Sequence, residues 1–409
     1  MATFDLRIDN LVYGGEGIGR MPDGRAVFVP YTIPGELIRT RVIEDKRHFA
    51  RGELMEVIEP SPQRERPRCG HFTICGGCHY QHMSYPAQLQ AKSAILQEQL
   101  MRIGRIAELP PVEIVKPAEP WYYRNQVQFH LTQEGKLGYQ KARSRQTFAI
   151  RECHLPEEAI GQLWPQLDIE PMTGLERIIL RAGQDGDVML ILESANPQPV
   201  DFSIESLPVS IIQQGPASSL VLAGSDHITM EVLARQFRVS SNAFFQVNTE
   251  LAEEMVSHLM KNLPLDETMT VLDVYCGVGL FSAFLAPRVK QLVGIEISSD
   301  SCADYITNLD EYDQVSLYEA PAEDVLAGIN FHPDVIVMDP PRDGLGAKAV
   351  EGILSQAAPY LAYFSCDPAT LSRDARRFIS GEYELTKMVL FDMFPQTYHL
   401  ESLTYWVRR

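Results

Sequence analysis

The 409-residue sequence has no apolar run that approaches the ~18 residues needed to cross a membrane as a helix. Its N-terminus lacks the apolar stretch of a secretory signal, because Met1-Ala-Thr-Phe-Asp5 reaches a charged residue at once. Glycine and proline, 27 of each, are not enriched as they are in fibrous or disordered chains. We therefore expect a folded, cytoplasmic protein without a membrane partner, long enough for two or three domains.

Cysteine is scarce and odd in number, with 7 in the chain, which argues against a framework of disulfide bonds. Three of these cysteines, Cys69, Cys75 and Cys78, nevertheless lie within ten residues of one another. Such close spacing indicates that the thiols bind a metal ion or a metal cluster.

Basic residues are fewer than acidic ones: the formal net charge is -18 at pH 7, which by itself disfavours a nucleic-acid partner. The excess of acidic residues is unevenly distributed along the chain. Residues 1–70 hold eleven basic and eleven acidic residues, and residues 121–153 hold six basic residues against two acidic ones. A polyanion responds to the local potential more than to the net charge, so RNA stays open as a partner.

Local patterns divide the chain into three parts. Short β-rich runs between turn signals over residues 3–60 predict a small β-barrel. A helix over 85–106 and strands between 121 and 230 predict a β-rich middle part. From about residue 240, helices alternate with parallel-type strands, so the fold class is α/β with a doubly wound, Rossmann-like C-terminal domain. We predict the domains 1–60, 61–235 and 236–409.

The strand predicted over 270–274 leads into a glycine turn, Gly277-Val-Gly279, at the start of a helix. Seventeen residues after Gly279, Glu296 ends the next strand, where a carboxylate can accept both hydroxyl protons of a ribose. Ser282 replaces the third glycine of the phosphate-binding pattern. This favours S-adenosylmethionine over NAD, because the former has no pyrophosphate. The alternative is a glycine turn with a purely structural role.

Two further predicted strands end in side chains that can do chemistry. Asp339, in Asp-Pro-Pro-Arg, follows the strand over 334–338, and Cys366 follows the strand over 360–364. Ligands of open α/β sheets bind at the carboxyl ends of the strands. Cys366 is therefore a candidate nucleophile rather than an inert buried thiol. Cys276, inside the glycine turn, is expected to pack and not to react.

Near the C-terminus, His399 and Glu401 alternate at a spacing of two. Both can therefore lie on one face of a terminal strand, and either is a candidate general base. The alternative is a pair of surface polar residues.

The pattern Cys69-x5-Cys75-Gly-Gly-Cys78-x2-Gln81-His82, with Cys153 further along, resembles a four-cysteine [4Fe–4S] site. It is similar to that of the S-adenosylmethionine-dependent RNA (uracil-5-)-methyltransferases, in their 23S ribosomal-RNA branch. The resemblance extends over essentially the whole chain, and the first sixty residues resemble the OB-like, RNA-binding TRAM barrel of that branch. It implies a central iron–sulfur domain; the spacing alone leaves a four-cysteine zinc site open.

The same resemblance implies roles for single residues of a C-terminal class I methyltransferase domain. Two positions depart from the family: Leu280 stands where many members have Asn or Thr, and Asp367 stands where they have Asn. A carboxylate beside a nucleophilic thiol tends to raise the pKa of that thiol. The implied roles are contact with the cofactor for Gln246, Tyr275, Glu296 and Asp339, nucleophile for Cys366, and proton acceptor for Glu401.

The implied reaction is methylation of C5 of a uridine in RNA, most simply 23S ribosomal RNA. Addition of a thiolate to C6 makes C5 nucleophilic, and a base must remove the C5 proton before the thiolate can leave. The target nucleotide has to be unstacked, which favours a loop. Transfer RNA as substrate, cytosine as the target base, and a non-catalytic RNA-binding assembly factor are the alternatives. We expect the protein to be a monomer.

Overall fold

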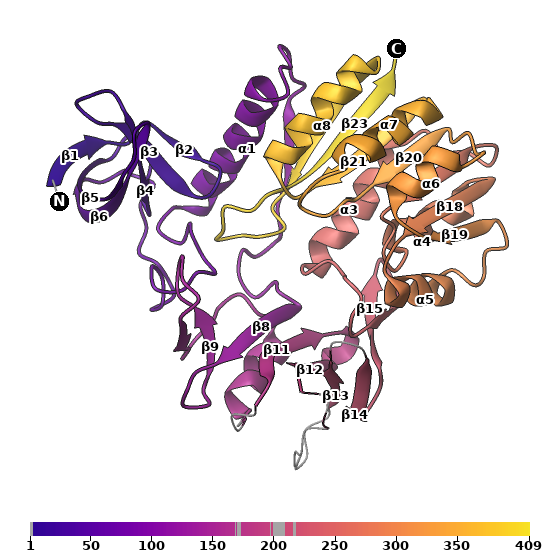
Figure 1. Ribbon diagram of the computed structural model, residues 1–409, viewed down its shortest axis with the longest axis horizontal. Helices are drawn as coiled ribbons and strands as arrows, with labels where there is room; N and C mark the ends of the chain where they lie inside the picture. Colours follow the sequence, from indigo (N-terminus) through magenta and orange to yellow (C-terminus); the bar gives the residue numbers. More distant parts are fainter. Residues whose placement is uncertain (1–2, 168, 170–172, 197, 199–208, 216–217) are drawn as a thin grey trace.

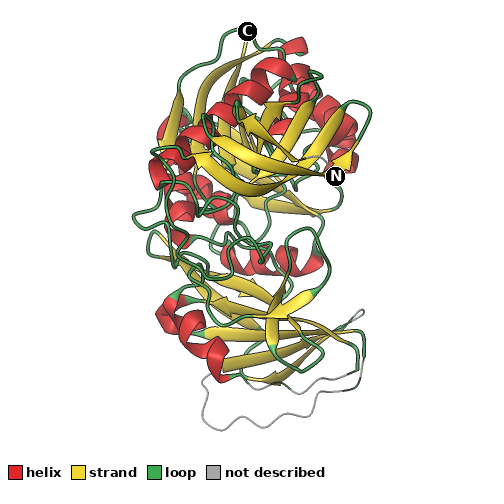
Figure 2. Cartoon of the chain, turned by 90° about the vertical axis from the view of Figure 1, so that its left-hand side faces the viewer, coloured by secondary structure: helices red, strands yellow, loops and turns green. Residues whose placement is uncertain are grey.

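The structure, a computed structural model, describes residues 3–409 except 168, 170–172, 197, 199–208 and 216–217. Three parts are visible (Figure 1): an N-terminal β-domain, a central β-sheet, and a C-terminal α/β part. Figure 2 shows the central sheet below the other two. Among the described residues, no helix is both long and apolar enough to span a bilayer.

The N-terminal domain is a six-stranded sheet in the order β1-β5-β6-β4-β3-β2. Its strands alternate buried and exposed residues, as β5 does with Ile38 and Thr40 buried and Arg39 and Arg41 exposed. This alternation buries one face around Leu6, and it confirms the predicted small β-domain. The strands are β1 Thr3–Arg7, β2 Asn10–Val12, β3 Glu16–Arg20, β4 Ala26–Pro30, β5 Leu37–Asp45 and β6 Phe49–Glu59.

The central part is a seven-stranded sheet in the order β10-β9-β8-β11-β12-β13-β14, followed by a separate hairpin of β15 and β16. Its core forms under α2 from alternating residues of β11 and β12, such as Ile178 and Leu190. The elements are β8 Gln126–Leu131, β9 Leu137–Gln140, β10 Thr147–Ala149, α2 Glu158–Leu163, β11 Leu175–Ala182, β12 Val188–Ser194, β13 Val209–Gln214, β14 Ser219–Ala223, β15 His227–Val232 and β16 Arg235–Ser240. Short 3-10 turns lie at Trp164–Gln166 and Gln184–Gly186.

The C-terminal sheet has eight strands in the order β19-β18-β17-β20-β21-β23-β22-β7, with helices on both faces. Five strands from β19 to β21 are parallel, and β23 is antiparallel to its neighbours. The elements are α3 Thr249–Asn262, β17 Thr270–Val274, α4 Leu280–Leu285, a 3-10 turn Ala286–Arg288, β18 Gln291–Glu296, α5 Ser299–Asn308, β19 Val315–Glu319, α6 Ala322–Gly328, β20 Val335–Met338, α7 Gly346–Gln356, β21 Tyr360–Ser365, α8 Pro368–Ser380, β22 Tyr383–Phe391 and β23 Glu401–Arg408.

Both faces of this sheet are buried, which explains the uninterrupted apolar runs of its strands. In β20, Val335 and Val337 pack in one core with α3 and α4, whereas Ile336 and Met338 pack in the other with α7 and α8. A strand between two helical layers has no solvent face and therefore no polar alternation. This confirms the doubly wound α/β expectation.

The range 61–235 also contributes to the C-terminal sheet. Strand β7, Val112–Val115, extends the sheet edge by parallel pairing with β22, as in the register Met388 to Val112. Helix α1, Tyr85–Arg102, packs against α8 and begins after Ser84 with a proline in its first turn. The chain thus enters the C-terminal layer before it forms the central sheet.

Helix α1 holds the loop 392–400 through a buried ion pair. The Nζ atom of Lys92 lies 2.5 Å from Oδ1 of Asp392 and 2.9 Å from the carbonyl oxygen of Phe394, and both charged side chains are 0% exposed. The hydroxyl of Tyr85 donates to the other carboxylate oxygen at 2.8 Å. This loop leads directly into β23.

Replacement of Lys92 by Met should therefore lower the free energy of unfolding by about 3–5 kcal/mol, because it leaves a buried carboxylate without its cation. The double variant Lys92→Met/Asp392→Leu should recover most of that loss, since it removes both charges. Urea denaturation of the two variants and the wild type measures the difference. Equal losses in the single and double variants would contradict the ion-pair account.

Candidate active site

The glycine turn after β17 has the backbone geometry that its sequence predicts. Tyr275, Gly277 and Gly279 have positive φ angles of 65°, 54° and 90°. A Cβ atom added to Gly279 would lie 2.4 Å from Cδ1 of Leu309, so only glycine fits there. A Cβ atom added to Gly277 would meet no atom within 4 Å. The turn is therefore closely packed on one side and open on the other.

Glu296, at the end of β18, is held by backbone donors. Its Oε2 atom accepts from the N–H of Gly277 at 3.0 Å, and its Oε1 atom accepts from those of Ile297 at 2.9 Å and Ser298 at 2.8 Å. A carboxylate has about four acceptor positions, so this one is fixed in place and can still accept from a ligand.

Two carboxyl groups lie beside the turn in a water-poor setting. Asp273, in β17, is fully buried and accepts from Oγ of Ser282 at 2.6 Å. Its Oδ1 atom has no hydrogen-bond partner among the described residues. Burial raises the pKa of Asp273 to about 7, and burial together with the charge of Asp273 raises the pKa of Asp339 to about 7. Nε2 of Gln246 donates to Oδ2 of Asp339 at 3.3 Å.

Cys366 and Glu401 meet at the same sheet edge because β21 and β23 are paired. The register joins Ser365 to Ser402, so Cys366 leaves β21 where Glu401 enters β23. Burial, with Glu401 and Asp339 nearby, raises the pKa of Cys366 to about 12, against the lowering effect of Arg342. Burial and Asp339 raise the pKa of Glu401 well above its ordinary value.

These shifts share a physical cause. These acidic groups lie in poorly solvated surroundings, and the charge of one hinders ionisation of the next. Asp273 acts in this way on Asp339, and Asp339 acts on Glu401 and Cys366. The Oε1 atom of Glu401 is buried without a hydrogen-bond partner in the described part of the chain. A ligand that brings positive charge or hydrogen-bond donors would therefore lower the pKa values of these groups.

Asp367, which stands beside Cys366 where other family members have Asn, caps the following helix. Its Oδ1 atom accepts from the N–H groups of Ala369 and Thr370, both at 2.9 Å, at the start of α8. This is the ordinary role of an N-cap aspartate. Its effect on the pKa of Cys366 is a rise, as expected, but it follows burial, Glu401 and Asp339 in size.

His399 does not share a strand face with Glu401, because β23 begins only at Glu401. The expectation of a common face was therefore wrong. The ring of His399 lies tilted against that of Tyr398, with ring centroids 4.2 Å apart, and it lines the cavity of the cysteines. Burial, followed by Arg342, lowers the pKa of His399 to about 3, so the imidazole is neutral. Cys276 is buried in the core, where packing is the expected role.

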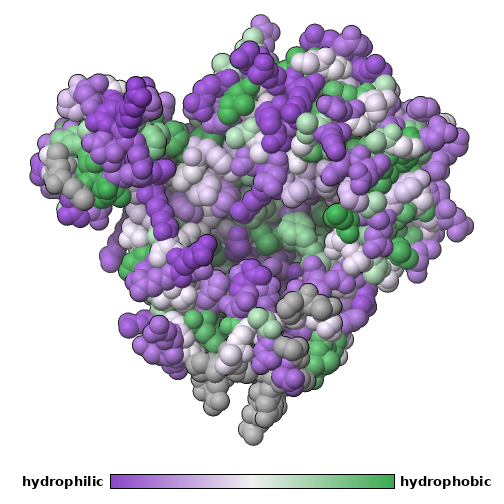
Figure 3. Space-filling view, in the orientation of Figure 1, coloured by the Kyte–Doolittle hydropathy of each residue, from purple (hydrophilic) through white to green (hydrophobic). Residues whose placement is uncertain are grey.

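All four predicted ligand cysteines line a single cavity of ≈ 520 Å³. Burial raises the pKa of Cys75 to about 11 and of Cys78 to about 12, and the neighbouring thiols, Cys69 and Cys153, add to the rise. Among the residues described, no group of three or more His, Cys, Asp or Glu has the arrangement of a metal site. Basic residues of the segment 121–153 line the same cavity: Arg124, Lys141 and Arg143. Figure 3 shows the molecule hollowed at its centre, between the three parts.

The cysteine loop is joined to the loop before Glu401. The N–H groups of His79 and Tyr80, directly after Cys78, donate to the carbonyl oxygen of Gln396 at 2.9 and 3.0 Å. Gln396 has a positive φ of 68° and is held on its other side by Gln88 of α1. Gln396 therefore connects the loop that carries the cysteines with the loop that leads to Glu401.

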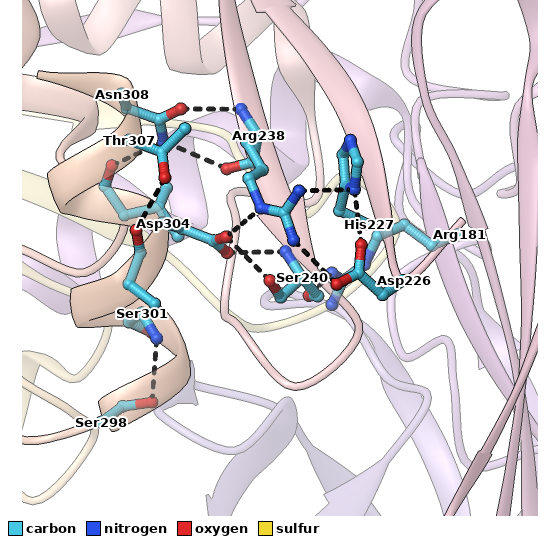
Figure 4. Close-up of polar contacts among 12 residues, drawn as sticks. Arg181, Asp226, His227, Arg238, Ser240, Ser298, Ser301, Asp304, Thr307 and Asn308 are labelled. Atoms are coloured by element: carbon cyan, nitrogen blue, oxygen red, sulfur yellow. Dashed lines mark hydrogen bonds and ion pairs between the residues drawn. The ribbon is translucent and has the colours of Figure 1, made fainter. Parts of the chain in front are cut away.

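A polar network fixes the segment that carries Gln246 (Figure 4). Asp304 of α5 is fully buried and accepts from Nε of Arg238 at 3.0 Å and from the N–H of Ser240 at 2.6 Å. Arg238 also donates to Asp226 at 2.9 Å. From the central sheet, Arg181 donates to the carbonyl oxygen of Ser240 at 3.0 Å. The β15–β16 hairpin, which precedes Gln246, is thus hydrogen-bonded to α5 of the C-terminal part and to β11 of the central sheet.

A sequence model of the family described as tRNA (Uracil-5-)-methyltransferase matches residues 200–409, more than half of the chain. The chain belongs to this family. The predicted membership and the activity class, an RNA methyltransferase of the uracil-5 type, are therefore confirmed. A model of the TRAM domain matches residues 2–55, which confirms the identity predicted for the barrel.

Relatives of this uracil-5-methyltransferase cover it from end to end. An RNA methyltransferase of Thermosynechococcus vestitus is 34% identical over 98% of this chain and 97% of its own, and one of Aquifex aeolicus is 32% identical over 97% of both. The crystal structure of Pyrococcus abyssi tRNA (uracil-54, C5)-methyltransferase in complex with S-adenosyl-L-homocysteine matches with a TM-score of 0.76. That match has 22% identity and covers 99% of this chain and 100% of the other, which shows a common fold.

Sequence reasoning assigned no role to three groups at this site. Asp273 had a readable signal, because a carboxylate inside an apolar strand is unusual. Arg342, which lowers the pKa of both Cys366 and Glu401, belongs to the quoted Asp-Pro-Pro-Arg segment. Tyr13 gave no such signal, since it comes from the distant N-terminal domain and meets Tyr398, in the loop before Glu401, only in the folded chain.

The two glycines of the turn should respond differently to alanine. Gly279→Ala should lower the free energy of unfolding by about 3 kcal/mol or more, because the new Cβ adds a clash to an unfavourable φ. Gly277→Ala, the matched control, should lose only about 1 kcal/mol, the cost of the left-handed backbone alone. Thermal or urea unfolding measures both, and equal losses would contradict the packing described.

Proposed function

We propose that this protein transfers a methyl group from S-adenosylmethionine to C5 of a uridine in RNA. The observation that supports this most strongly is that paired strands bring Cys366 and Glu401 together, with Asp339 near enough to raise the pKa of both groups. A thiol nucleophile and a carboxyl base at a nucleoside-type site are the two groups that C5 methylation of a pyrimidine needs.

The residues around the turn fit the proposed cofactor. Glu296 is fixed by three N–H donors and keeps an acceptor position for the ribose hydroxyls. The Cβ position of Gly277 is open, which leaves room for a nucleoside beside the turn, and Gln246 and Asp339 are hydrogen-bonded to each other. Tyr275, which has a positive φ of 65° at the start of the turn, is the remaining proposed contact. S-adenosylmethionine supplies a methyl group on a positively charged sulfur. A cation beside Asp339, Glu401 and Cys366 lowers their pKa values and favours their ionised forms.

In the proposed reaction, the Cys366 thiol first loses its proton to solvent water, which leaves a thiolate. The thiolate electron pair then forms a bond to C6 of the uracil, and the C5–C6 π electrons move toward O4 as an enolate. The enolate forms the C5–methyl bond as the methyl–sulfur bond breaks, which neutralises the sulfonium. The charge of Arg342 lowers the pKa of Cys366 and therefore favours the first step.

Glu401 has the role of proton acceptor at C5. Once C5 carries both a proton and a methyl group, the Glu401 carboxylate takes the proton. The electron pair of the broken C5–H bond then restores the C5–C6 double bond. The C6–sulfur bond breaks and Cys366 leaves as a thiolate. His399 does not compete for this role, because its ring lies in the cysteine cavity.

The four cysteines are proposed to bind a [4Fe–4S] cluster as thiolates, with zinc as the alternative. Support comes from their common cavity, which has the volume for a group of several atoms. A cluster there would tie the segment around Cys75 to Cys153, and through the Gln396 contacts it would steady the loop that leads to Glu401. The proposed role is structural rather than redox.

The RNA partner is proposed to be 23S ribosomal RNA, bound by the TRAM barrel and the basic segment 121–153, with the protein acting as a cytoplasmic monomer. Transfer RNA is the second candidate, and it is favoured by the full-length structural likeness to an archaeal transfer-RNA enzyme. Nucleoside mass spectrometry of both RNA fractions, from cells with and without the gene, decides between them. If neither fraction loses 5-methyluridine when the gene is absent, the proposed function is refuted.

Substitutions of the two reacting residues should give different products. RNA that contains 5-fluorouridine should become trapped on the wild type, because fluorine at C5 cannot leave as a proton. Cys366→Ala should form no adduct and should lose methyl transfer by about 10³-fold or more. Glu401→Gln should instead accumulate an adduct on ordinary RNA, with turnover about 10²–10⁴-fold slower. Denaturing gels and peptide mapping measure the adducts, and a trapped complex in Cys366→Ala would exclude this nucleophile.

Metal analysis tests the cysteine site. The protein isolated without oxygen should contain about four iron and four sulfide per chain, and Cys153→Ser should lower both contents. Cys302→Ser, in α5, is a matched control that should keep them. Whether the cysteines hold a cluster is measured by the iron-to-zinc ratio, the acid-labile sulfide content and the visible absorption spectrum. None of these measurements depends on enzymatic activity. One zinc ion per chain and no sulfide would establish the alternative.

A further inference from the structure

Two aromatic residues stand just before the central sheet, outside the site described above. Trp121 and Tyr122 precede β8, and 47% of the Tyr122 surface is exposed. Tyr122 has a positive φ of 56°, which a bulky residue adopts only at a cost in free energy. Its N–H donates to the carbonyl oxygen of His154 at 2.9 Å, which holds this backbone in place. The fold therefore keeps an aromatic ring at the surface through a strained but anchored backbone.

The side chain of Arg68 contacts both of these rings. Its Cζ atom lies 5.3 Å from the centre of the Trp121 ring and 5.1 Å from that of Tyr122, within the range of a cation–π contact. Nη2 of Arg68 donates to the Tyr122 hydroxyl at 2.9 Å, and that hydroxyl is hydrogen-bonded to Nδ1 of His154 at 3.3 Å. Arg68, Trp121 and Tyr122 thus form a surface cluster whose geometry is fixed before any ligand binds.

Arg68 is an exposed cation without a carboxylate partner. In the part of the chain that the structure describes, it forms no ion pair, whereas the exposed arginines Arg7 and Arg39 of the N-terminal domain are paired with Glu59 and Asp5. A chain with a net charge of -18 has ample carboxylates, yet this guanidinium faces two aromatic rings instead. Because a guanidinium can stack on a ring and bind a phosphate at the same time, Arg68 is available for an anion.

The surface cluster lies close to the loop that leads to Glu401. Tyr123, which follows the cluster directly in the chain, is buried, and its hydroxyl donates to the carbonyl oxygen of Pro395 at 3.1 Å. Consecutive Cα atoms are only about 3.8 Å apart, so the cluster is within short reach of the loop 392–400. A nucleotide a few positions away from a uridine bound beside Glu401 can therefore reach the cluster.

We propose that the surface cluster binds one unstacked base of the RNA substrate, with the base against the exposed Tyr122 ring and its phosphate on Arg68. This inference rests on the proposed function, because it takes RNA as the substrate. Proteins recognise single-stranded RNA by stacking its splayed-out bases on aromatic rings, and arginine binds its phosphates. A duplex keeps its bases stacked on one another, so the cluster selects RNA that offers an unpaired loop beside the target uridine.

A purely structural role for the same contacts is the alternative. Arg68 precedes Cys69 and His154 follows Cys153, so the contacts of the cluster also join the two segments that carry these cysteines. A structural tie of this kind accounts for neither the exposed ring nor the unpaired cation. It also predicts a different result, because substitutions would then release metal or destabilise the fold instead of weakening RNA binding.

The test measures the Kd of the full-length protein, isolated without oxygen, for two fluorescent RNAs: a hairpin with an unpaired loop and a duplex of equal length without one. Tyr122→Leu should raise the Kd for the hairpin about 5- to 100-fold, the usual effect of losing one base-stacking ring, and should change the Kd for the duplex by less than about 2-fold. Tyr122→Phe, which keeps the ring, should bind the hairpin within about 3-fold of the wild type. Tyr318→Leu, on β19 and 46% exposed, is the matched control and should equal the wild type.

The phosphate contact has a separate signature. Arg68→Met should weaken hairpin binding and reduce the slope of log Kd against log salt concentration by about 0.7, the value of one phosphate contact to a single strand. Tyr122→Leu should change that slope less, because it removes no charge. The iron, zinc and sulfide contents and the thermal unfolding of each variant should match those of the wild type.

The outcomes separate this inference from the proposed function. An unchanged hairpin Kd in Tyr122→Leu, an equal loss for hairpin and duplex, or a loss of affinity that accompanies loss of metal would refute the base-binding site alone. A wild type that binds the hairpin no more tightly than the duplex would refute it as well, and an unchanged salt slope in Arg68→Met would refute the phosphate contact. Hairpin binding that depends on Tyr122, in a protein that forms no 5-methyluridine, would instead refute the proposed function and leave this site standing.

Discussion

Crowding of acidic groups in poorly solvated surroundings is the constraint on which this site depends. Asp273, Asp339, Glu401 and Cys366 lie in or directly beside four neighbouring strands of the C-terminal sheet. Burial makes each of them harder to ionise, and the charge of another member of the group adds to this effect for Asp339, Glu401 and Cys366. The proposed reaction of Cys366 requires a thiolate, so positive charge has to reach these acidic groups before Cys366 becomes a nucleophile. The sulfonium of the proposed cofactor is a source of this charge at the place where it is needed.

The second organising feature is the loop 392–400, which three distant segments hold. Lys92 of α1 binds Asp392, the residues after Cys78 bind Gln396, and Tyr13 of the barrel packs on Tyr398. The loop then delivers Glu401 to the crevice. The barrel and the cysteine loop thus meet the C-terminal part at the loop that precedes Glu401, which gives both of them a structural role in the site.

Much of this arrangement could be predicted from sequence, because the signals are local. Apolar strands followed by Gly277-Val-Gly279, Asp339 or Cys366 place those residues at the carboxyl edge of a parallel sheet. What escaped prediction depends on tertiary contacts. The short segment Val112–Val115 carries no sign that it will pair with β22, some 270 residues later. Tyr13 likewise reaches Tyr398 only through the packing of the barrel. His399 was misplaced because β23 begins two residues later than the alternation suggested.

The account holds that the positive charge of the cofactor controls the ionisation of these acidic groups. It can be tested by comparing the affinities of S-adenosylmethionine and S-adenosylhomocysteine as the pH changes. The two differ in the methyl group and the positive charge that it gives to sulfur. Calorimetric titration from pH 5 to pH 8.5 should show that the preference for S-adenosylmethionine increases as pH rises toward about 7 and then levels off, since above that pH Asp339 is ionised whether or not the sulfonium is bound. The rise should approach 10-fold per pH unit for each linked proton. An affinity ratio that stays constant over this range would contradict the account.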